Sequence, residues 1–351
     1  MTRLLSYANA LKEAQEYCLE EYPETLLMGL GAPYPKWIFG STIGLQDKFG
    51  KDRVFDIPLS ENAITGVALG ASITGMRTIL THQRIDFSLV SIEQIVNQSA
   101  KWYYMFDGKM KAPIVIRMII GRGWGQGPQH SQSLQSWFAH IPGLKVIMPT
   151  TAYDAKGMLI SAIEDDNPVL CLEHRWLYEI QDHVPKHGYR VDLNKSNILK
   201  EGNDLTIIGV SYMTLECLKA ASLLKEKGIS AEVIDLRSIK PIDVEKIVNS
   251  IKKTRNVVIV DTAHLPCGIS SEISSIITEN CFEYLDQAPK RIGLPDYPTP
   301  TSHYLSKEYY PSVETIAKCC TEIIKPNNKI FFKETTNINH DQPNASFVGP
   351  F

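Results

Sequence analysis

Short apolar or β-branched runs alternate with longer helical patterns along most of this chain, and this alternation limits the fold more than any other feature. RTILTH (77–82), APIVIRMIIG (112–121) and PVLCLEH (168–174) are examples of such runs. Strands separated by helices of this length are typical of βαβ units, whose strands pair in parallel. Nearly continuous apolar strands fit a sheet covered on both faces. We therefore expect an α/β fold built on parallel sheets.

The alternation occurs in two series, which predicts two domains. Between Trp176 and Asn203 the pattern weakens into polar chain that contains Pro and Lys. Beyond Pro326 the sequence is rich in Asn and has no period. We predict a first domain over 1–185, a linker over 186–203, a second domain over 204–325, and an extended or disordered tail over 326–351.

Composition excludes several classes of protein. With 36 Lys and Arg against 39 Asp and Glu, the net charge is −3, so there is no basic excess to bind a nucleic acid. No apolar run approaches the roughly 20 residues of a membrane span. The seven cysteines are scattered and form no C-x-x-C pair, which argues against a disulfide framework or a zinc site. The N-terminus reads as an amphipathic helix without the features of a signal or transit peptide. We expect a cytoplasmic protein.

The segment DIPLSENAITGVALGASITG (56–75) carries the first candidate site residue. A strand ends at Pro58, and Glu61 lies where a helix begins. One interpretation is helix capping, with Ser60 as the N-cap and Glu61 beside the positive end of the helix dipole. The glycines of this helix indicate close packing, because glycine otherwise lowers helix stability.

A Gly-rich loop, GRGWGQGPQHSQ (121–132), carries the second candidate. Its glycines do not match the G-x-G-x-x-G spacing of a dinucleotide site, and the chain contains no P-loop. His130 lies between Gln129, Ser131 and Gln132. This cluster can donate hydrogen bonds or shuttle a proton, while the alternative is a flexible loop without chemistry.

Several motifs in one order carry a family resemblance. They are DIPLSE with GVALG, DFSLVSIEQIVNQSAKWYYM, the QHSQS loop, HIPGLKVIMPTTAYDAKGML, SAIEDDNPVLCLE, VIDLRSIKPID and VVIVD. Together they resemble the β subunit of thiamine-diphosphate-dependent 2-oxo acid dehydrogenases (the pyruvate, branched-chain or acetoin decarboxylase component), in the transketolase superfamily. The likeness covers about residues 5 to 325. It implies a pyrimidine-binding domain, a linker and a transketolase C-terminal domain.

The resemblance assigns roles to four residues. It implies that Glu61 bonds the aminopyrimidine nitrogen of thiamine diphosphate and favours the imino tautomer, which deprotonates the thiazolium carbon. Phe87 corresponds to the aromatic that stacks on the pyrimidine, although a buried Phe is ordinarily core. Gln83 corresponds to a pocket-lining position. His130 corresponds to the histidine that assists the substrate or the acyl acceptor.

The resemblance also implies a structural potassium ion. Backbone carbonyls and one carboxylate suit a hard monovalent cation, and the alternative is an ordinary turn at a helix C-terminus. The corresponding positions are Ile114, Ala162, Ile163, Asp165 and Asn167.

A missing motif implies a partner. The superfamily holds the diphosphate and its magnesium through G-D-G…N, of which Asp107-Gly108 is a poor remnant. The resemblance therefore implies an α subunit that supplies this part, in an α2β2 enzyme. It also implies a small 2-oxo acid substrate and transfer of the acyl group to a lipoyl-bearing acyltransferase or another acceptor.

Two departures leave the reaction open. Leu30 and Gly31 stand where the family carries acids that relay protons. His82 and Arg84 flank Gln83 and could bind a substrate phosphate or carboxylate, or could be surface charges at a subunit contact. The departures keep a second hypothesis, a transketolase-like two-subunit carboligase in sugar or secondary metabolism. A third hypothesis is a non-catalytic structural subunit.

Overall fold

We describe the protein from a computed structural model that covers residues 2–34, 37–121, 125–326 and 332. The chain forms two compact units. The first consists mainly of residues 1–121 and 137–193, and the second mainly of 122–136 and 194–349. The boundaries expected from the sequence stay predictions. Most of the predicted tail, at 327–331 and 333–351, lies outside the described residues.

A parallel sheet forms the centre of the first unit, with its strands in the order β6-β7-β5-β4-β2-β3. Every residue of the central strand β5 is buried, as its continuous apolar sequence predicts. The strands are β2 (Thr25–Gly29), β3 (Val54–Phe55), β4 (Arg77–His82), β5 (Ile114–Ile120), β6 (Lys145–Ile147) and β7 (Val169–His174).

Helices pack against this sheet. The helices α1 and α7 contact each other, and α3 packs against β4 and β5. Ser6 and Thr151 cap α1 and α7 by accepting a hydrogen bond from the N–H three residues later. The helices are α1 (Tyr7–Glu21), α2 (Leu45–Phe49), α3 (Glu61–Ile73), α4 (Ile85–Ser88), α5 (Ala100–Met105) and α7 (Ala152–Glu164). The division of the sequence into two units falls within α6 (Gln135–Ala139).

Two features of the first unit differ from the sequence-based expectation. The N-terminus begins with a strand, β1 (Thr2–Ser6), that pairs antiparallel with β8 (Gln181–Pro185). The segment SLVSIEQIVNQSAKWYYM (88–105), whose amphipathic pattern predicts one long helix, is broken into the end of α4, a 3₁₀ turn at 89–91, a π-helix at 94–99, and α5. The hydroxyls of Ser88 and Ser91 each donate to the carbonyl three residues earlier, which competes with regular helical bonding.

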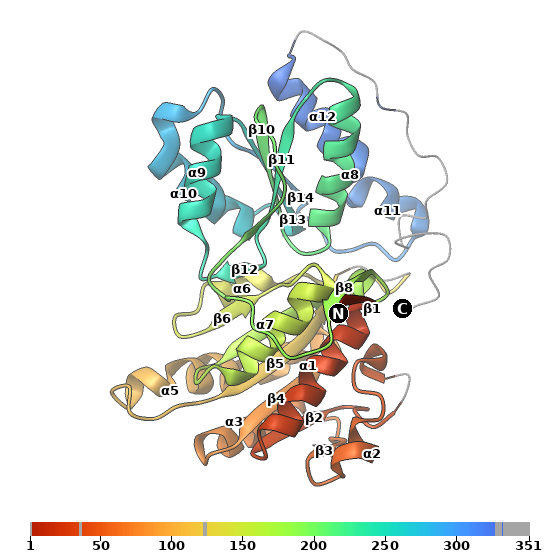
Figure 1. Ribbon diagram of the computed structural model, residues 1–351, viewed down its shortest axis with the longest axis vertical. Helices are drawn as coiled ribbons and strands as arrows, with labels where there is room; N and C mark the ends of the chain where they lie inside the picture. Colours follow the sequence, from red (N-terminus) through yellow and green to blue (C-terminus); the bar gives the residue numbers. More distant parts are fainter. Residues whose placement is uncertain (1, 35–36, 122–124, 327–331, 333–351) are drawn as a thin grey trace. The chain divides into compact units, whose positions relative to one another are not determined.

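The second unit has a five-stranded sheet in the order β14-β13-β10-β11-β9, parallel except for β9. Its helices lie on both faces, with α8 and α12 on one side and α9 and α10 on the other (Figure 1). The strands are β9 (Asn197–Lys200), β10 (Leu205–Gly209), β11 (Ala231–Asp235), β13 (Val257–His264) and β14 (Lys290–Leu294); β12 (Ser238–Lys240) is short. The helices are α8 (Met213–Glu226), α9 (Val244–Thr254), α10 (Ile269–Cys281), α11 (His303–Tyr309) and α12 (Val313–Ile324). Further 3₁₀ turns occupy 37–40, 175–177 and 282–284.

The expected α/β fold with two domains around parallel sheets is confirmed, with β9 as an antiparallel addition. In the part of the chain that the structure describes, no helix is both long enough and apolar enough to cross a membrane.

Candidate active site

The carboxyl ends of β2, β3 and β4 form one edge of the first sheet, and side chains tie their loops together. The amide of Gln83 donates to the carbonyl of Leu30 at 3.0 Å. The Asp56 carboxylate accepts the N–H groups of Gly31 at 2.6 Å and of Ile57 at 2.9 Å. Ligands of open α/β sheets bind at this edge. Gln83 thus lies at the edge where the resemblance places it, but its amide already holds a neighbouring loop.

Glu61 is the first residue of α3 and is half-buried. Among the residues that the structure describes, its carboxylate has no hydrogen bond or ion pair. Ser60 is the N-cap residue, as the capping interpretation has it, but its side chain accepts no capping hydrogen bond. The Thr65 hydroxyl donates to the Glu61 carbonyl at 2.7 Å and fixes the first turn. Glu61 therefore presents an acceptor on a fixed backbone.

His82 and Arg84 follow each other closely at the end of β4, and both are buried, with 2% and 7% of their surface exposed. The His82 Nε2 lies 3.3 Å from the Thr65 hydroxyl, and burial lowers the pKa of His82 to about 4. His82 is therefore a neutral structural contact under α3, which gives no support to substrate binding. Burial lowers the pKa of Arg84 to about 10, and its guanidinium lies 5.8 Å from the centroid of the Phe39 ring.

Phe87 lies in α4 and is half-buried, and exposed apolar side chains occur on the elements around it. Leu59 precedes α3, Val67 lies in α3 and Val90 follows α4, with 77%, 56% and 64% of their surface exposed. The helix α3 packs against α4 and against the turn that contains Val90. Glu61 and Phe87 thus belong to packed neighbouring elements that carry several exposed apolar side chains.

His130 lies in the second unit, in the loop that leads into α6, and is half-buried. Three residues that sequence reasoning missed form hydrogen bonds at the end of this loop. The buried Gln135 amide donates to Asp261 Oδ1 at 2.8 Å and to the Thr262 hydroxyl at 3.1 Å. Asp261 ends the apolar run VVIVD, and this position could have indicated the contact from the sequence, because a buried acid needs a partner.

Asp261 is an unusual acid because its carboxyl is fully removed from water. Burial raises the pKa of Asp261 to about 6, although bonds from Gln135 and from neighbouring main-chain N–H groups oppose the shift. Its Oδ2 has no hydrogen-bond partner in the described part of the chain. The carboxyl therefore takes up a proton at a pH at which a surface aspartate is ionised.

The predicted potassium ligands lie around the C-terminus of α7, and an arginine already occupies part of the set. Arg77 Nη1 donates to the carbonyl oxygens of Ile163 at 3.0 Å and of Asp165 at 3.3 Å. The carbonyl of Ala162 accepts the N–H of Asp165. The Asn167 N–H donates to Asp165 Oδ1 at 3.0 Å. Ile114, which completes the predicted set, is the first residue of β5. This arrangement does not fit a bound potassium ion.

The residues fit one half of a thiamine diphosphate site. A half-buried carboxylate with no described partner, and an aromatic side chain on a helix packed against its own, suit the aminopyrimidine ring. Asp107, the remnant of the diphosphate motif, lies in an exposed turn after α5 and pairs with Lys109 at 2.9 Å. Among the described residues, no cluster of three or more His, Cys, Asp or Glu could hold a metal ion.

Comparisons with known proteins match two domains to this chain. The model of the transketolase pyrimidine-binding domain matches residues 4–181, and that of the transketolase C-terminal domain matches residues 194–316. The β subunit of acetoin:2,6-dichlorophenolindophenol oxidoreductase from Bacillus subtilis (strain 168) is 38% identical over 336 residues, which cover 92% of this chain and 98% of that protein. The mitochondrial pyruvate dehydrogenase E1 β subunit of Dictyostelium discoideum is 37% identical, covering 93% of each chain. The 2-oxoisovalerate dehydrogenase β subunit of Bacillus subtilis (strain 168) is 38% identical, covering 84% of this chain and 90% of that one.

The chain belongs to the E1 β subunits of the 2-oxo acid dehydrogenases. These are subunits of heteromeric decarboxylase components in the thiamine-diphosphate-dependent transketolase superfamily, so this E1 β subunit implies an α partner. A solved structure described as a split-gene transketolase, an inactive β4 tetramer, superposes with a TM-score of 0.74. It is 23% identical, covers 91% of this chain and 98% of its own, and shows the shared fold.

Proposed function

We propose that this E1 β subunit supplies the pyrimidine half of a thiamine diphosphate site in an α2β2 enzyme that decarboxylates a short 2-oxo acid. The α subunit would supply the groups that hold the diphosphate and its magnesium ion. The acyl group would pass to a lipoyl-bearing acyltransferase or another acceptor. The observation that carries the proposal is the Glu61 carboxylate, half-buried at the start of α3 with no partner among the described residues.

Glu61 and Phe87 would hold the aminopyrimidine ring. Thiamine diphosphate, when bound, supplies a carbon nucleophile that stabilises the negative charge left by decarboxylation. Glu61 would share a proton with the ring nitrogen, which is general acid–base assistance from a fixed side chain. Phe87 would contact the ring face. Gln83 would act indirectly, because its amide donates to the Leu30 carbonyl and so holds that loop at the edge of the site.

His130 and Arg84 would act on the substrate and the acceptor. A half-buried imidazole in a polar loop can donate to a carbonyl oxygen or transfer a proton. Arg84 is a candidate carboxylate partner, because a guanidinium can bind a carboxylate through paired N–H donors and Arg84 closely follows the carboxyl end of β4. His82 is not part of this proposal.

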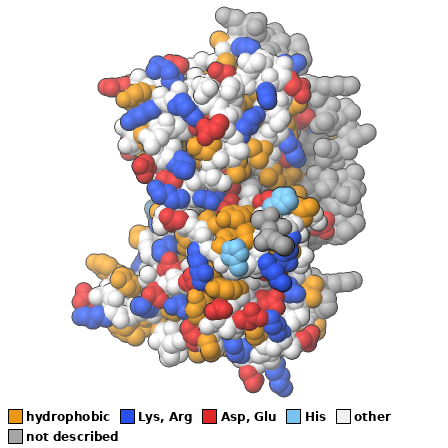
Figure 2. Space-filling model, in the orientation of Figure 1, with side chains coloured by type: hydrophobic (Ala, Val, Ile, Leu, Met, Phe, Trp, Pro, Cys, Tyr) orange, Lys and Arg blue, Asp and Glu red, His pale blue; other side chains and the backbone are white. Residues whose placement is uncertain are grey.

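Exposed apolar surface supports a tightly bound partner. Four consecutive side chains at the end of α5, Tyr103 to Phe106, are between 40% and 88% exposed. Figure 2, in the orientation of Figure 1, shows hydrophobic side chains gathered at this end of the first unit. Contiguous apolar patches of this kind mark interaction surfaces. The exposed Leu59, Val67 and Val90 extend the same character to the elements around Glu61.

The test is to co-purify the chain with its α partner, add thiamine diphosphate and magnesium, and screen 2-oxo acids with an artificial electron acceptor. We expect turnover of a short 2-oxo acid, and a fall of about 10²-fold or more in Glu61→Gln. The matched control is Glu272→Gln, since Glu272 is an exposed acid in the first turn of another helix, α10. Its activity should equal that of the unaltered complex.

Two results would contradict the proposal. Full activity of Glu61→Gln would remove the carboxylate from the mechanism. Turnover of sugar phosphates with carbon–carbon bond formation, and no turnover of any 2-oxo acid, would favour the carboligase hypothesis instead.

A further inference from the structure

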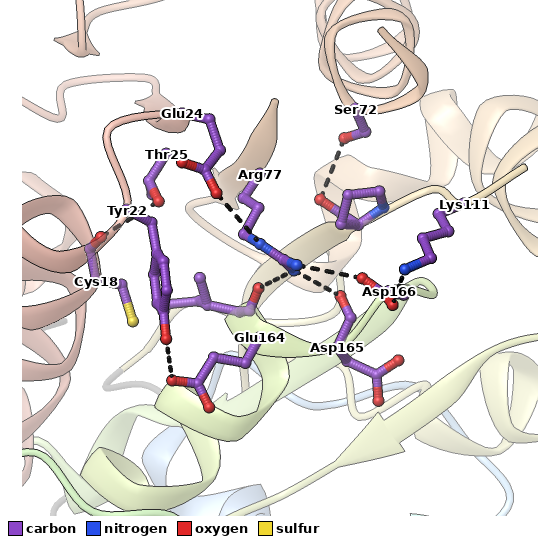
Figure 3. Close-up of polar contacts among 12 residues, drawn as sticks. Cys18, Tyr22, Glu24, Thr25, Ser72, Arg77, Lys111, Glu164, Asp165 and Asp166 are labelled. Carbon is purple, nitrogen blue, oxygen red and sulfur yellow. Dashed lines mark hydrogen bonds and ion pairs between the residues drawn. The ribbon is translucent and has the colours of Figure 1, made fainter. Parts of the chain in front are cut away.

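The C-terminus of α7, where the family resemblance implies potassium, contains the side chain of Arg77. Figure 3 shows its guanidinium pointing at the main-chain oxygens of the last helical turn. Nη1 donates to the carbonyls of Ile163 at 3.0 Å and of Asp165 at 3.3 Å. Carbonyls at the end of a helix lack intrahelical partners and carry the negative end of the helix dipole. A positive charge is therefore favoured at this point, and a side chain supplies it.

Contacts on several sides hold the Arg77 guanidinium in this position. Nη2 donates to Asp166 Oδ1 at 3.2 Å, and Nε lies 3.7 Å from Glu24 Oε1. The ring of Tyr22 lies beneath the guanidinium, with Cζ 6.0 Å from the ring centroid. Arg77 is also fixed at its backbone, because it is the first residue of β4 and its N–H donates to the Glu24 carbonyl at 3.0 Å. Only 23% of its side chain is exposed.

The charges of the cluster leave no need for an additional cation. Lys145 pairs with the Asp165 carboxylate, and Lys111 Nζ lies 2.6 Å from Asp166 Oδ2. With Arg77 these make three cations, which face the three carboxylates of Glu24, Asp165 and Asp166. A potassium ion here would add a net charge and would lie beside a guanidinium that already donates to the carbonyls of two of its five predicted ligand residues.

We propose that the Arg77 guanidinium is a built-in substitute for a monovalent cation at the C-terminus of α7, so that this chain neither binds nor requires potassium there. The inference concerns the stability of the first unit and does not depend on the proposed function. Its test therefore needs no cofactor, substrate or α subunit.

The test is thermal unfolding of the full-length chain in potassium, sodium or choline chloride at equal ionic strength. The unaltered chain should have the same melting temperature in all three salts. Arg77→Ala should lower the melting temperature by about 3–8 °C in choline chloride, and potassium should restore part of that loss more effectively than sodium. Arg77→Lys keeps a cation at the position. Its melting temperature should lie between those of the unaltered chain and Arg77→Ala, and should be the same in potassium and sodium.

Arg53→Ala is the matched control. Arg53 is also partly buried and also donates to main-chain carbonyls, those of Leu19, Tyr22 and Thr25, at 2.9 to 3.1 Å. Arg53→Ala should have a lower melting temperature than the unaltered chain, and potassium should restore no more of that loss than sodium.

Two outcomes would overturn the proposal. Stabilisation of the unaltered chain by potassium over sodium would show that an ion binds in the presence of Arg77. Equal melting temperatures of Arg77→Ala in potassium and sodium would show that the position is not a cation site. The comparison of the unaltered chain in potassium and in sodium tests the proposal even if Arg77→Ala does not fold.

Discussion

Replacement of Glu173 by glutamine should destabilise the first unit strongly, because Glu173 forms a fully buried ion pair with Arg117. The two residues lie on the neighbouring strands β7 and β5, and neither side chain has exposed surface. Arg117 Nε and Nη2 donate to the two carboxylate oxygens at 2.6 and 2.8 Å. Gln15 and Ser41 accept the remaining guanidinium bonds, each at 2.9 Å, and the Tyr178 hydroxyl donates to Glu173.

The size of the loss follows from the charge that would be left behind. Burial by itself lowers the pKa of Arg117, but attraction and hydrogen bonding to Glu173 outweigh burial and raise the pKa above its usual range. Arg117 stays charged, so Glu173→Gln leaves a guanidinium away from water with only neutral acceptors. Breaking a buried pair in this way costs about 3–5 kcal/mol. At about 2–4 °C for each kcal/mol in a unit of this size, the melting temperature should fall by about 6–20 °C.

Urea unfolding followed by tryptophan fluorescence would measure the effect. Four of the five tryptophans belong to the first unit, so the signal reports mainly on that unit: Trp37, Trp102, Trp137 and Trp176. The matched control is Glu164→Gln. Glu164 also binds an arginine and a tyrosine, Arg190 at 3.0 Å and Tyr22 at 2.7 Å, but this pair is partly exposed to solvent. Exposed pairs contribute about 0–1 kcal/mol.

A loss of less than about 1 kcal/mol in Glu173→Gln would refute the reasoning, because it would mean that water reaches Arg117. The double variant Arg117→Met with Glu173→Leu separates charge from packing. It should be less destabilised than the sum of its two single variants, since no unpaired charge remains. Additive losses would show that the pair acts through shape alone.

Three further predictions concern titration and catalysis. Burial lowers the pKa of His82 to about 4, so the folded state excludes a proton that the unfolded chain binds below its pKa of 6.5. The free energy of unfolding should therefore fall by about 3 kcal/mol as the pH drops from 6.5 to 4. Urea unfolding of His82→Gln should not show this dependence on pH. The pKa of Asp261 is raised from 3.8 to about 6, so the folded state keeps a proton that the unfolded chain releases. The free energy of unfolding should therefore fall by about 3 kcal/mol as the pH rises from 3.8 to 6. In Asp261→Asn the free energy of unfolding should depend less on pH over this range. His130→Ala should lower turnover with the acyl acceptor by about 10²-fold or more while thiamine diphosphate affinity, measured by calorimetry on the α/β complex, stays unchanged; equal losses in both would show that the loop only supports the cofactor pocket.

Several strands of the first sheet were predictable because each satisfies a local rule, whereas β9 lies within the segment predicted as a linker. RTILTH coincides with β4 and the largely apolar part of APIVIRMIIG with β5, since a strand buried on both faces is mostly apolar. Arg117 in β5 is an exception that is buried as an ion pair with Glu173. The pairing of β1 with β8 was not predictable. Its strands lie almost the whole first domain apart in sequence, and the short segment TRLLS carries no local signal that separates it from the helix that follows.

The candidate site was predictable only where the family motifs reach. The motifs assign roles to Glu61, Phe87 and His130 by their order along the chain, and these assignments stay predictions. They did not reveal Arg77 at the end of α7 or the bond from Gln135 to Asp261, whose partners are separated by 86 and 126 residues. Contacts over such distances depend on how the strands are ordered in the sheet. A pattern read along the chain does not contain that information.

The surroundings of Glu61 bear on how its substitution should be interpreted. The loops at this edge of the sheet are held by bonds that do not involve its carboxylate: Gln83 holds Leu30, and Asp56 holds Gly31. The first turn of α3 is held by the Thr65 hydroxyl on the Glu61 carbonyl, a bond that any side chain at position 61 preserves. A site on such a fixed backbone keeps its shape when one of its functional groups is changed. Loss of activity in Glu61→Gln with unchanged stability would therefore report the chemistry of the carboxylate and not a change in the fold.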